Sequence, residues 1–352
     1  MSRYLTMLGR GALGLALAGA VLTTAPAAAQ SPAQIQAAVD AAYAKYKNLD
    51  EGANADYIPA LAEVDPKLFG IAVVDASGRV YTAGNQTTEV SIQSISKVYT
   101  MALVMDQRDP DAILKTIGAD ATGMRFNSIV SVAWSFKGLG GSKLEDAAEM
   151  NALVNPGAIS ATSMVAGTTR DEIWGSILSF YNAAAGRQLT VLRGVYESEA
   201  ATNQRNQAIG MLMYAYGYIK DNPLRAVDIY TEQCAVGVTS KDLAMMAATL
   251  AFGGRNPVTK QQVMKADVVP EVLAVMATAG LYDDSGKWLW LTGLPAKSGV
   301  GGGILAVSPG KFGIAVVSPP LDAAGNSIRA QRAIADISNA LGGNPYAQTG
   351  SR

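Results

Sequence analysis

The sequence predicts an α+β protein in which an antiparallel sheet flanked by helices is joined to a second, all-helical lobe. Strand-like runs occur near both ends of the 352-residue chain, and helix start and stop signals fill its middle. Because 49% of the residues are hydrophobic, the chain can bury a substantial core. We therefore expect strands from distant segments to pair in one sheet, with the intervening helices forming the second lobe.

The first 29 residues differ from the rest of the chain. Arg3 and Arg10 precede an apolar run over residues 11–22, which leads into three alanines ending at Ala29. The run is short for a membrane span, and the pattern predicts a secretory signal peptide cleaved after Ala29. We therefore expect a mature domain of residues 30–352 that is exported to the periplasm or the exterior and has no membrane contact after cleavage.

Residue counts exclude several classes of protein. The 28 basic and 29 acidic residues give a net charge of -1, which becomes -3 when the two arginines of the signal segment are removed, and this argues against nucleic acid as a partner. Cys234 is the single cysteine, so no internal disulfide can form. The chain has no histidine, which excludes Ser-His-Asp sites and histidine-ligated metals. We expect no metal, and a hydrolytic base would be lysine, tyrosine or a carboxylate.

Local signals predict the first elements in order. Ile35, Val39 and Tyr43 recur at helical spacing and predict a helix over residues 32–47. The β-rich runs "LFGIAVVD" and "RVYTA" are separated by Ala-Ser-Gly at 76–78 and predict a hairpin. The apolar stretch "ISKVYTMALVMDQ" that follows predicts a buried helix.

The middle of the chain carries two capping boxes, each of which predicts a helix start. Thr169 and Glu172 begin one helix, which Gly186 closes, and Thr239 and Asp242 begin another. Two later strands and a last helix are predicted at 304–307, 312–318 and 327–341. The predicted limits are a sheet lobe of about 55–110 and 285–342, a helical lobe of about 111–284 and a disordered tail of about 343–352.

An S-x-x-K pattern occurs twice, so spacing alone cannot identify a catalytic serine. Ser94 and Lys97 lie three residues apart at a predicted helix start, so their side chains share one face. Ser308 and Lys311 flank a Pro-Gly turn between two strand-like runs.

In the first copy, a lysine whose pKa falls well below about 10.4 could take the serine proton. Backbone N–H groups at the helix start would stabilise an oxyanion. The alternative is that Ser94 and Ser96 only cap the helix while Lys97 extends to solvent.

A second segment favours catalysis. Lys297-Ser298-Gly299 precedes a strand and resembles the K-T-G of penicillin-recognising serine enzymes, which also follows their S-x-x-K after a long helical insertion. A lysine on this edge strand would face the nucleophile and lower the pKa of Lys97 by like-charge repulsion.

Seven collinear blocks over about residues 55–341 resemble the serine-dependent glutaminase family. They are "ADYIPALAEVDPKLFGIAV", "QSISK", "VNPGAI", "SEAATNQRNQAIG", "MMAATLAFGG", "MATAGLYDDSGKW" and "GLPAKSGVGGGI". The resemblance implies a β-lactamase-like fold and hydrolysis of L-glutamine to L-glutamate and ammonia, without a metal or an organic cofactor. It also implies a homo-oligomer, either a homodimer or a homotetramer.

The resemblance assigns roles residue by residue. Ser94 would be the nucleophile, Lys97 its base and Tyr282 a proton shuttle, with an oxyanion hole from the N–H groups of Ser94 and Val300. The substrate-binding positions would be Tyr57, Ser94, Asn155, Glu199, Asn206, Tyr230, Tyr282 and Val300. Glu199 suits an α-ammonium, whereas amides and a phenol suit an α-carboxylate.

The sequence departs from the family pattern in places and leaves two alternatives open. The connection over 131–153 is longer and richer in glycine than in the family, and could form a lid or an oligomer contact. The surroundings of Glu199 lack some of the family's charge. A β-lactamase or D-alanyl-D-alanine peptidase would share the fold and the acyl-serine chemistry, although no S-D-N, S-x-N or Y-x-N lies between Ser94 and Lys297. A secreted glutamine-binding pseudoenzyme would keep the pocket without turnover.

Overall fold

The computed structural model describes residues 30–134 and 150–347. The predicted signal peptide, residues 135–149 of the long connection and residues 348–352 of the predicted tail lie outside the described residues. Within the two described ranges, none of the helices is both long and apolar enough to cross a bilayer.

Five strands form the main sheet, and every neighbouring pair is antiparallel. They are β1 (Gly70–Asp75), β2 (Val80–Gly84), β5 (Ala296–Ser298), β6 (Gly303–Ser308) and β7 (Phe312–Val317). The order β2-β1-β7-β6-β5 places β1 beside β7, which confirms the predicted pairing of distant segments. A two-stranded ladder joins β3 (Val90–Ser91) to β4 (Gly237–Val238).

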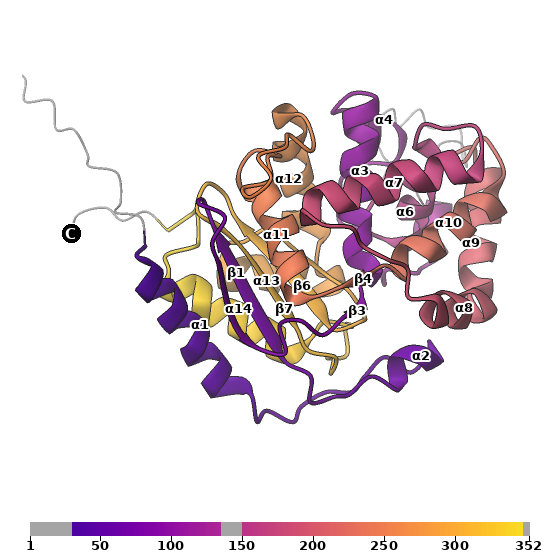
Figure 1. Ribbon diagram of the computed structural model, residues 1–352. Helices are drawn as coiled ribbons and strands as arrows, with labels where there is room; N and C mark the ends of the chain where they lie inside the picture. The colour runs from indigo at the N-terminus through magenta and orange to yellow at the C-terminus, as the bar shows by residue number, and fades with distance from the viewer. Residues whose placement is uncertain (1–29, 135–149, 348–352) are drawn as a thin grey trace, which may run out of the picture.

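The two faces of the sheet are covered by different helices, because side chains alternate along each strand. Ile71 and Val73 of β1 pack with α1 (Pro32–Tyr46) and α14 (Ile328–Ala340). Figure 1 shows this pair on one side of the sheet and α11 (Ser240–Ala251) on the other. α11 falls in the range predicted for the helical lobe, yet it packs on β1, β6 and β7.

The remaining described helices gather mainly beside the sheet (Figure 1). They are α2 (Pro59–Ala62), α3 (Ser96–Gln107), α4 (Ala112–Thr116), α5 (Val130–Trp134), α6 (Asn155–Met164), α7 (Arg170–Ala185), α8 (Arg193–Thr202), α9 (Gln204–Ala215), α10 (Pro223–Cys234), α12 (Val269–Ala279) and α13 (Ser285–Thr292). Short 3₁₀ turns cover Gln93–Ile95, Ala266–Val268 and Tyr282–Asp284. Both predicted capping boxes are confirmed, and Gly186 ends α7 in a left-handed conformation.

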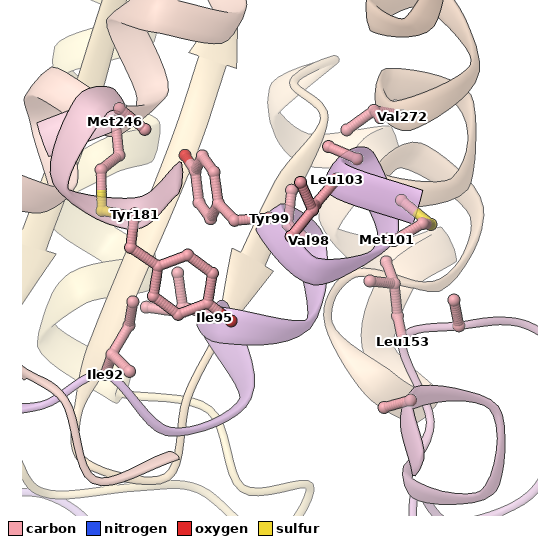
Figure 2. Close-up of a cluster of buried hydrophobic side chains, with 14 of the residues drawn as sticks. Ile92, Ile95, Val98, Tyr99, Met101, Leu103, Leu153, Tyr181, Met246 and Val272 are labelled. Atoms are coloured by element: carbon pink, nitrogen blue, oxygen red, sulfur yellow. The ribbon is translucent and has the colours of Figure 1, made fainter. Parts of the chain in front are cut away.

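Helix α3 is the buried helix that the apolar stretch predicts. Every residue from Ser96 to Met105 is buried, because α3 packs against α6, α7 and α12. Figure 2 shows Val98, Tyr99 and Met101 of this helix among side chains from neighbouring elements. The start of α3 is therefore held in position from several sides.

Candidate active site

A cavity of about 330 Å³ lies beside the turn that precedes α3, within the size range of small-molecule sites. Seven of the predicted residues line it: Tyr57, Ser94, Asn155, Glu199, Asn206, Tyr230 and Val300. The remaining two are bonded to lining residues: Tyr282 forms a hydrogen bond with Ser94, and Lys97 donates one to Asn155. The structure thus brings together all the predicted site residues from widely separated segments of the chain.

Ser94 lies in the 3₁₀ turn that leads into α3, and the N-cap position of α3 is occupied by Ile95 rather than by Ser94. Gln93 before it has a φ of 50°, a left-handed conformation that is unusual for a residue with a side chain. Such strain persists only where the surroundings enforce it, and it is common beside catalytic groups.

The chain after β5 lies directly against this turn. A Cβ added to Gly299 would lie 2.8 Å from the carbonyl oxygen of Ile92, and one added to Gly301 would lie 2.5 Å from that of Ser91. Only glycine permits this approach, which places Val300 beside the turn that carries Ser94. Ser94 and Val300 therefore line the same cavity.

Lys97 is buried, with 1% of its surface exposed, so the alternative in which it extends to solvent is wrong. Its Nζ donates to Asn155 Oδ1 at 2.7 Å and lies 6.0 Å from the centre of the Phe126 ring and 5.8 Å from that of Tyr230. Burial lowers the pKa of Lys97 to about 8, against the opposing charge of Glu199. A lysine with this pKa is neutral in a substantial fraction near pH 8 and can accept a proton.

Lys297 is also buried, on the edge strand β5, but it plays a different part from the one predicted. Its Nζ donates to the carbonyl oxygens of Gly280 and Ser298, each at 2.8 Å. Burial, and then the charge of Lys97, lower the pKa of Lys297 well below its ordinary value. The lowered pKa of Lys97 is caused by burial, and Lys297 is not among the groups that shift it.

Tyr282 opens the 3₁₀ turn before α13, with a left-handed φ of 54°. Its hydroxyl donates to the carbonyl oxygen of Ser298 at 3.3 Å and forms a hydrogen bond with Ser94. Burial raises the pKa of Tyr282 to about 12, so the phenol is neutral near pH 8. A neutral hydroxyl can accept one proton while it donates another, which suits a relay.

Asn155, the first residue of α6, connects Lys97 to Asn206 in the cavity lining. Its Oδ1 accepts hydrogen bonds from Lys97 Nζ and from the hydroxyl of Tyr230 at 3.2 Å. These two donors fix the orientation of the amide, so that Nδ2 donates to Asn206 Oδ1 at 3.0 Å. Two amides and a phenol are thereby held on one side of the cavity.

Glu199, on α8, is the buried acid of the cavity, with 7% of its surface exposed. Gln93 Nε2 donates to its Oε2 at 3.4 Å. Burial raises the pKa of Glu199 to about 7, against the effects of the Gln93 hydrogen bond and the charge of Lys97. A cation that enters the cavity would lower this pKa again and pair with the carboxylate.

Tyr57 lies at the mouth of the cavity, with 53% of its surface exposed. The next residue, Ile58, packs in a small apolar cluster with Val300 and Leu321. The segment that carries Tyr57 is therefore anchored to the wall that carries Val300.

The chain is similar to known glutaminases over most of its length. The sequence profile of the glutaminase family matches residues 52–346. The chain is 49% identical over 320 residues to a glutaminase of Colwellia psychrerythraea, which covers 90% of this chain and 100% of that protein. The chain belongs to the glutaminase family.

Solved glutaminase structures share the fold. A probable glutaminase, ybaS, has a TM-score of 0.86 at 43% identity and covers 91% of this chain and 100% of that one. A structure of Mglu in its glutamate form has a TM-score of 0.79 at 35% identity and covers 88% of this chain and 69% of that one. The predicted β-lactamase-like α+β fold is confirmed.

Further residues that were not predicted from the sequence also line the cavity of this glutaminase-family chain, among them Gln93, Phe126 and Arg205. Phe126 also contacts Tyr282, with ring centres 4.8 Å apart. Gln93 and Arg205 lie directly beside the predicted Ser94 and Asn206, so sequence proximity was the one available signal. Phe126 carried none, because an isolated phenylalanine is normally a core residue.

Proposed function

We propose that this protein hydrolyses L-glutamine to L-glutamate and ammonia through a glutamyl ester on Ser94. The observation that carries the proposal is one cavity lined by a serine, one carboxylate and a cluster of amides and phenols, with a buried lysine of lowered pKa bonded to one of those amides. The first group of residues suits acyl transfer, and the second suits the two charged ends of a free amino acid. Membership of the glutaminase family supports the same reaction.

In the first half-reaction, Ser94 Oγ attacks the side-chain carboxamide carbon as its proton passes to the neutral Lys97 amine. The negative charge that develops on the amide oxygen is stabilised by the N–H groups of Ser94 and Val300. Collapse of the intermediate breaks the C–N bond, and the departing nitrogen receives the proton through Lys97 and Tyr282. Ammonia leaves, and an ester between the glutamyl group and Ser94 remains.

In the second half-reaction, water takes the place of ammonia. Lys97 and Tyr282 accept a proton from the water as it attacks the ester carbon, the same oxyanion is stabilised, and the C–O bond to Ser94 breaks. Serine regains its proton and L-glutamate is released. No redox step or added co-reactant is needed for this balance.

The other residues would select the substrate. Glu199 would pair with the α-ammonium, while Asn206, Tyr230 and Tyr57 would bind the α-carboxylate. The Mglu structure in its glutamate form supports an amino acid of this type as ligand. Binding of both the α-ammonium and the α-carboxylate would hold the side-chain amide of the substrate against Ser94.

The test is ammonia release from L-glutamine by the protein and by Ser94→Ala, with L-asparagine and nitrocefin as further substrates. We expect turnover of L-glutamine that the substitution abolishes. Binding of L-glutamine without turnover would indicate a glutamine-binding pseudoenzyme and contradict the proposal. Hydrolysis of nitrocefin in place of L-glutamine would indicate a β-lactamase or peptidase of the same fold.

We further propose that the protein is exported and forms a homodimer or homotetramer. The N-terminal pattern of Arg3, Arg10 and the apolar run supports export, and resemblance to the family supports assembly. Cell fractionation with N-terminal sequencing, followed by light scattering of the mature protein, tests both. A cytoplasmic protein that begins at Met1, or a monomer, would contradict the respective proposal.

A further inference from the structure

The backbone around Tyr282 is strained and held by several hydrogen bonds. Among the described residues that carry side chains, three have a left-handed φ, namely Gln93, Lys260 and Tyr282. A bulky side chain disfavours this conformation, which persists only where neighbouring groups enforce it. Two of the three adjoin or contact the nucleophile, so the groups that enforce the conformation bear on its chemistry.

Ser285, the first residue of α13, contacts both sides of this strained position. Its Oγ accepts the N–H of Leu281 at 3.0 Å and donates to the carbonyl oxygen of Tyr282 at 2.8 Å. The side chain is 4% exposed, so water cannot readily replace these partners. One hydroxyl therefore links the N–H of Leu281 to the carbonyl group of Tyr282, on either side of the N–Cα bond of Tyr282.

Two further contacts hold the same short segment. Asn326 Nδ2 donates to the carbonyl oxygen of Leu281 at 3.4 Å, and Lys297 Nζ donates to that of Gly280. Lys297 Nζ also lies 4.0 Å from the centre of the Tyr282 ring. These contacts hold the carbonyl groups of Gly280 and Leu281 and the ring of Tyr282, whereas the Ser285 hydroxyl holds the N–H of Leu281 and the carbonyl group of Tyr282.

We infer that Ser285 is a positioning residue of the reaction, because its hydroxyl holds the left-handed backbone of Tyr282 and so directs the phenol toward Ser94. This rests on the proposed function of Tyr282 as a proton relay. Without the hydroxyl, the N–H of Leu281 loses its acceptor and Tyr282 relaxes toward a right-handed conformation that directs the ring elsewhere. The family resemblance assigned no role to Ser285.

The chain offers a matched control on the same helix. Thr292, at the other end of α13, is also buried; its Oγ1 accepts the N–H of Leu294 at 3.1 Å and donates to the carbonyl oxygen of Trp288 at 2.9 Å. Thr292→Val and Ser285→Ala therefore each remove a buried hydroxyl with one accepted and one donated backbone hydrogen bond. Both variants should lose a similar few degrees of Tm.

The experiment compares these variants in the full-length protein. We expect Ser285→Ala to lower kcat for L-glutamine roughly 10- to 100-fold with KM within about twofold, and Thr292→Val to leave both near wild type. Ser285→Thr, which keeps the hydroxyl, should retain most of kcat. In a Tyr282→Phe background, Ser285→Ala should lower kcat further by less than about twofold, because both changes remove the same relay.

Equal kcat losses in Ser285→Ala and Thr292→Val, or additive losses in the Tyr282→Phe background, would overturn the inference. Crystal structures of the two variants supply a readout that does not depend on the substrate. The φ of Tyr282 should stay left-handed in Thr292→Val and change in Ser285→Ala, and an unchanged φ in Ser285→Ala contradicts the inference. If the wild type fails to hydrolyse L-glutamine, the proposed function is wrong, and this φ angle still decides the role of Ser285.

Discussion

The two S-x-x-K segments share one spacing and have different surroundings. Lys97 is buried at the start of α3, beside a cavity and close to Glu199. Lys311 is exposed in the turn between β6 and β7, and Ser308 Oγ donates to the carbonyl oxygen of Gly343 at 2.7 Å. The comparison teaches that burial of the lysine and an adjoining cavity, rather than the spacing, make the first segment competent for acyl transfer.

The sharpest test of this comparison is removal of each serine hydroxyl. Ser94→Ala should lower kcat for L-glutamine by about 10⁴-fold or more, because no other group forms the ester. Ser308→Ala should leave kcat unchanged. Steady-state ammonia release measures both, and a comparable loss in the two variants would show that the segments are not functionally distinct.

Substitution of the two lysines should also have very different effects on kcat. Lys97→Met removes the base and should lower kcat about 10²- to 10⁴-fold, with folding retained because an apolar side chain replaces a buried amine. Lys311→Met should be active. The measurement is kcat together with Tm for each variant; near wild-type activity of Lys97→Met would exclude this lysine as the base.

Glu199 lines the same cavity as Ser94, and we expect it to act in substrate binding. Glu199→Gln keeps a similar shape but loses the charge that faces the α-ammonium, so KM should rise roughly 10- to 100-fold with a smaller effect on kcat. Glu197, exposed on the same helix, provides the control Glu197→Gln. Unchanged KM in Glu199→Gln would place the α-ammonium elsewhere in the cavity.

The pH dependence follows from two groups that act when deprotonated. Glu199, with a pKa of about 7, must be ionised to bind the ammonium, and Lys97, with a pKa of about 8, must be neutral to accept a proton. Activity should therefore fall as the pH is lowered through both values, with kcat/KM about tenfold or more lower at about pH 6 than at about pH 8.5. In Glu199→Gln, the step at the lower pKa should disappear from the pH profile of kcat/KM.

The smallest expected effect belongs to the second segment and concerns stability. Ser308→Ala loses the hydrogen bond to the Gly343 carbonyl and should lower the free energy of unfolding by about 1 kcal/mol. Urea denaturation measures it. An unchanged free energy would mean that this hydroxyl has no structural role, although its activity prediction would stand.

Much of the fold could be predicted because its signals are local. The hairpin of β1 and β2, both capping boxes and the turn between β6 and β7 depend on a few neighbouring residues. The contact of α11 with the sheet was not predicted, because hydrophobic periodicity identifies an apolar face but not the surface that will cover it.

Some features of the site were predicted from the sequence, and others were not. Motif order identified the segments that supply Ser94, Lys97 and Tyr282, because the resemblance extends over collinear blocks. The left-handed backbone of Tyr282 could not be predicted, since glycine is the residue that normally signals such a conformation. Phe126 was missed because its contact with Tyr282 joins residues distant in the chain.

The sequence by itself determined the residue types available for chemistry. It excluded histidine and disulfide chemistry, identified the family resemblance and named two S-x-x-K candidates. The tertiary structure decided which lysine is buried, what lowers its pKa and how Asn155 connects it to the cavity. The physical reason is that proton affinity depends on solvation and nearby charge, and both are set by groups that folding brings together from distant parts of the chain.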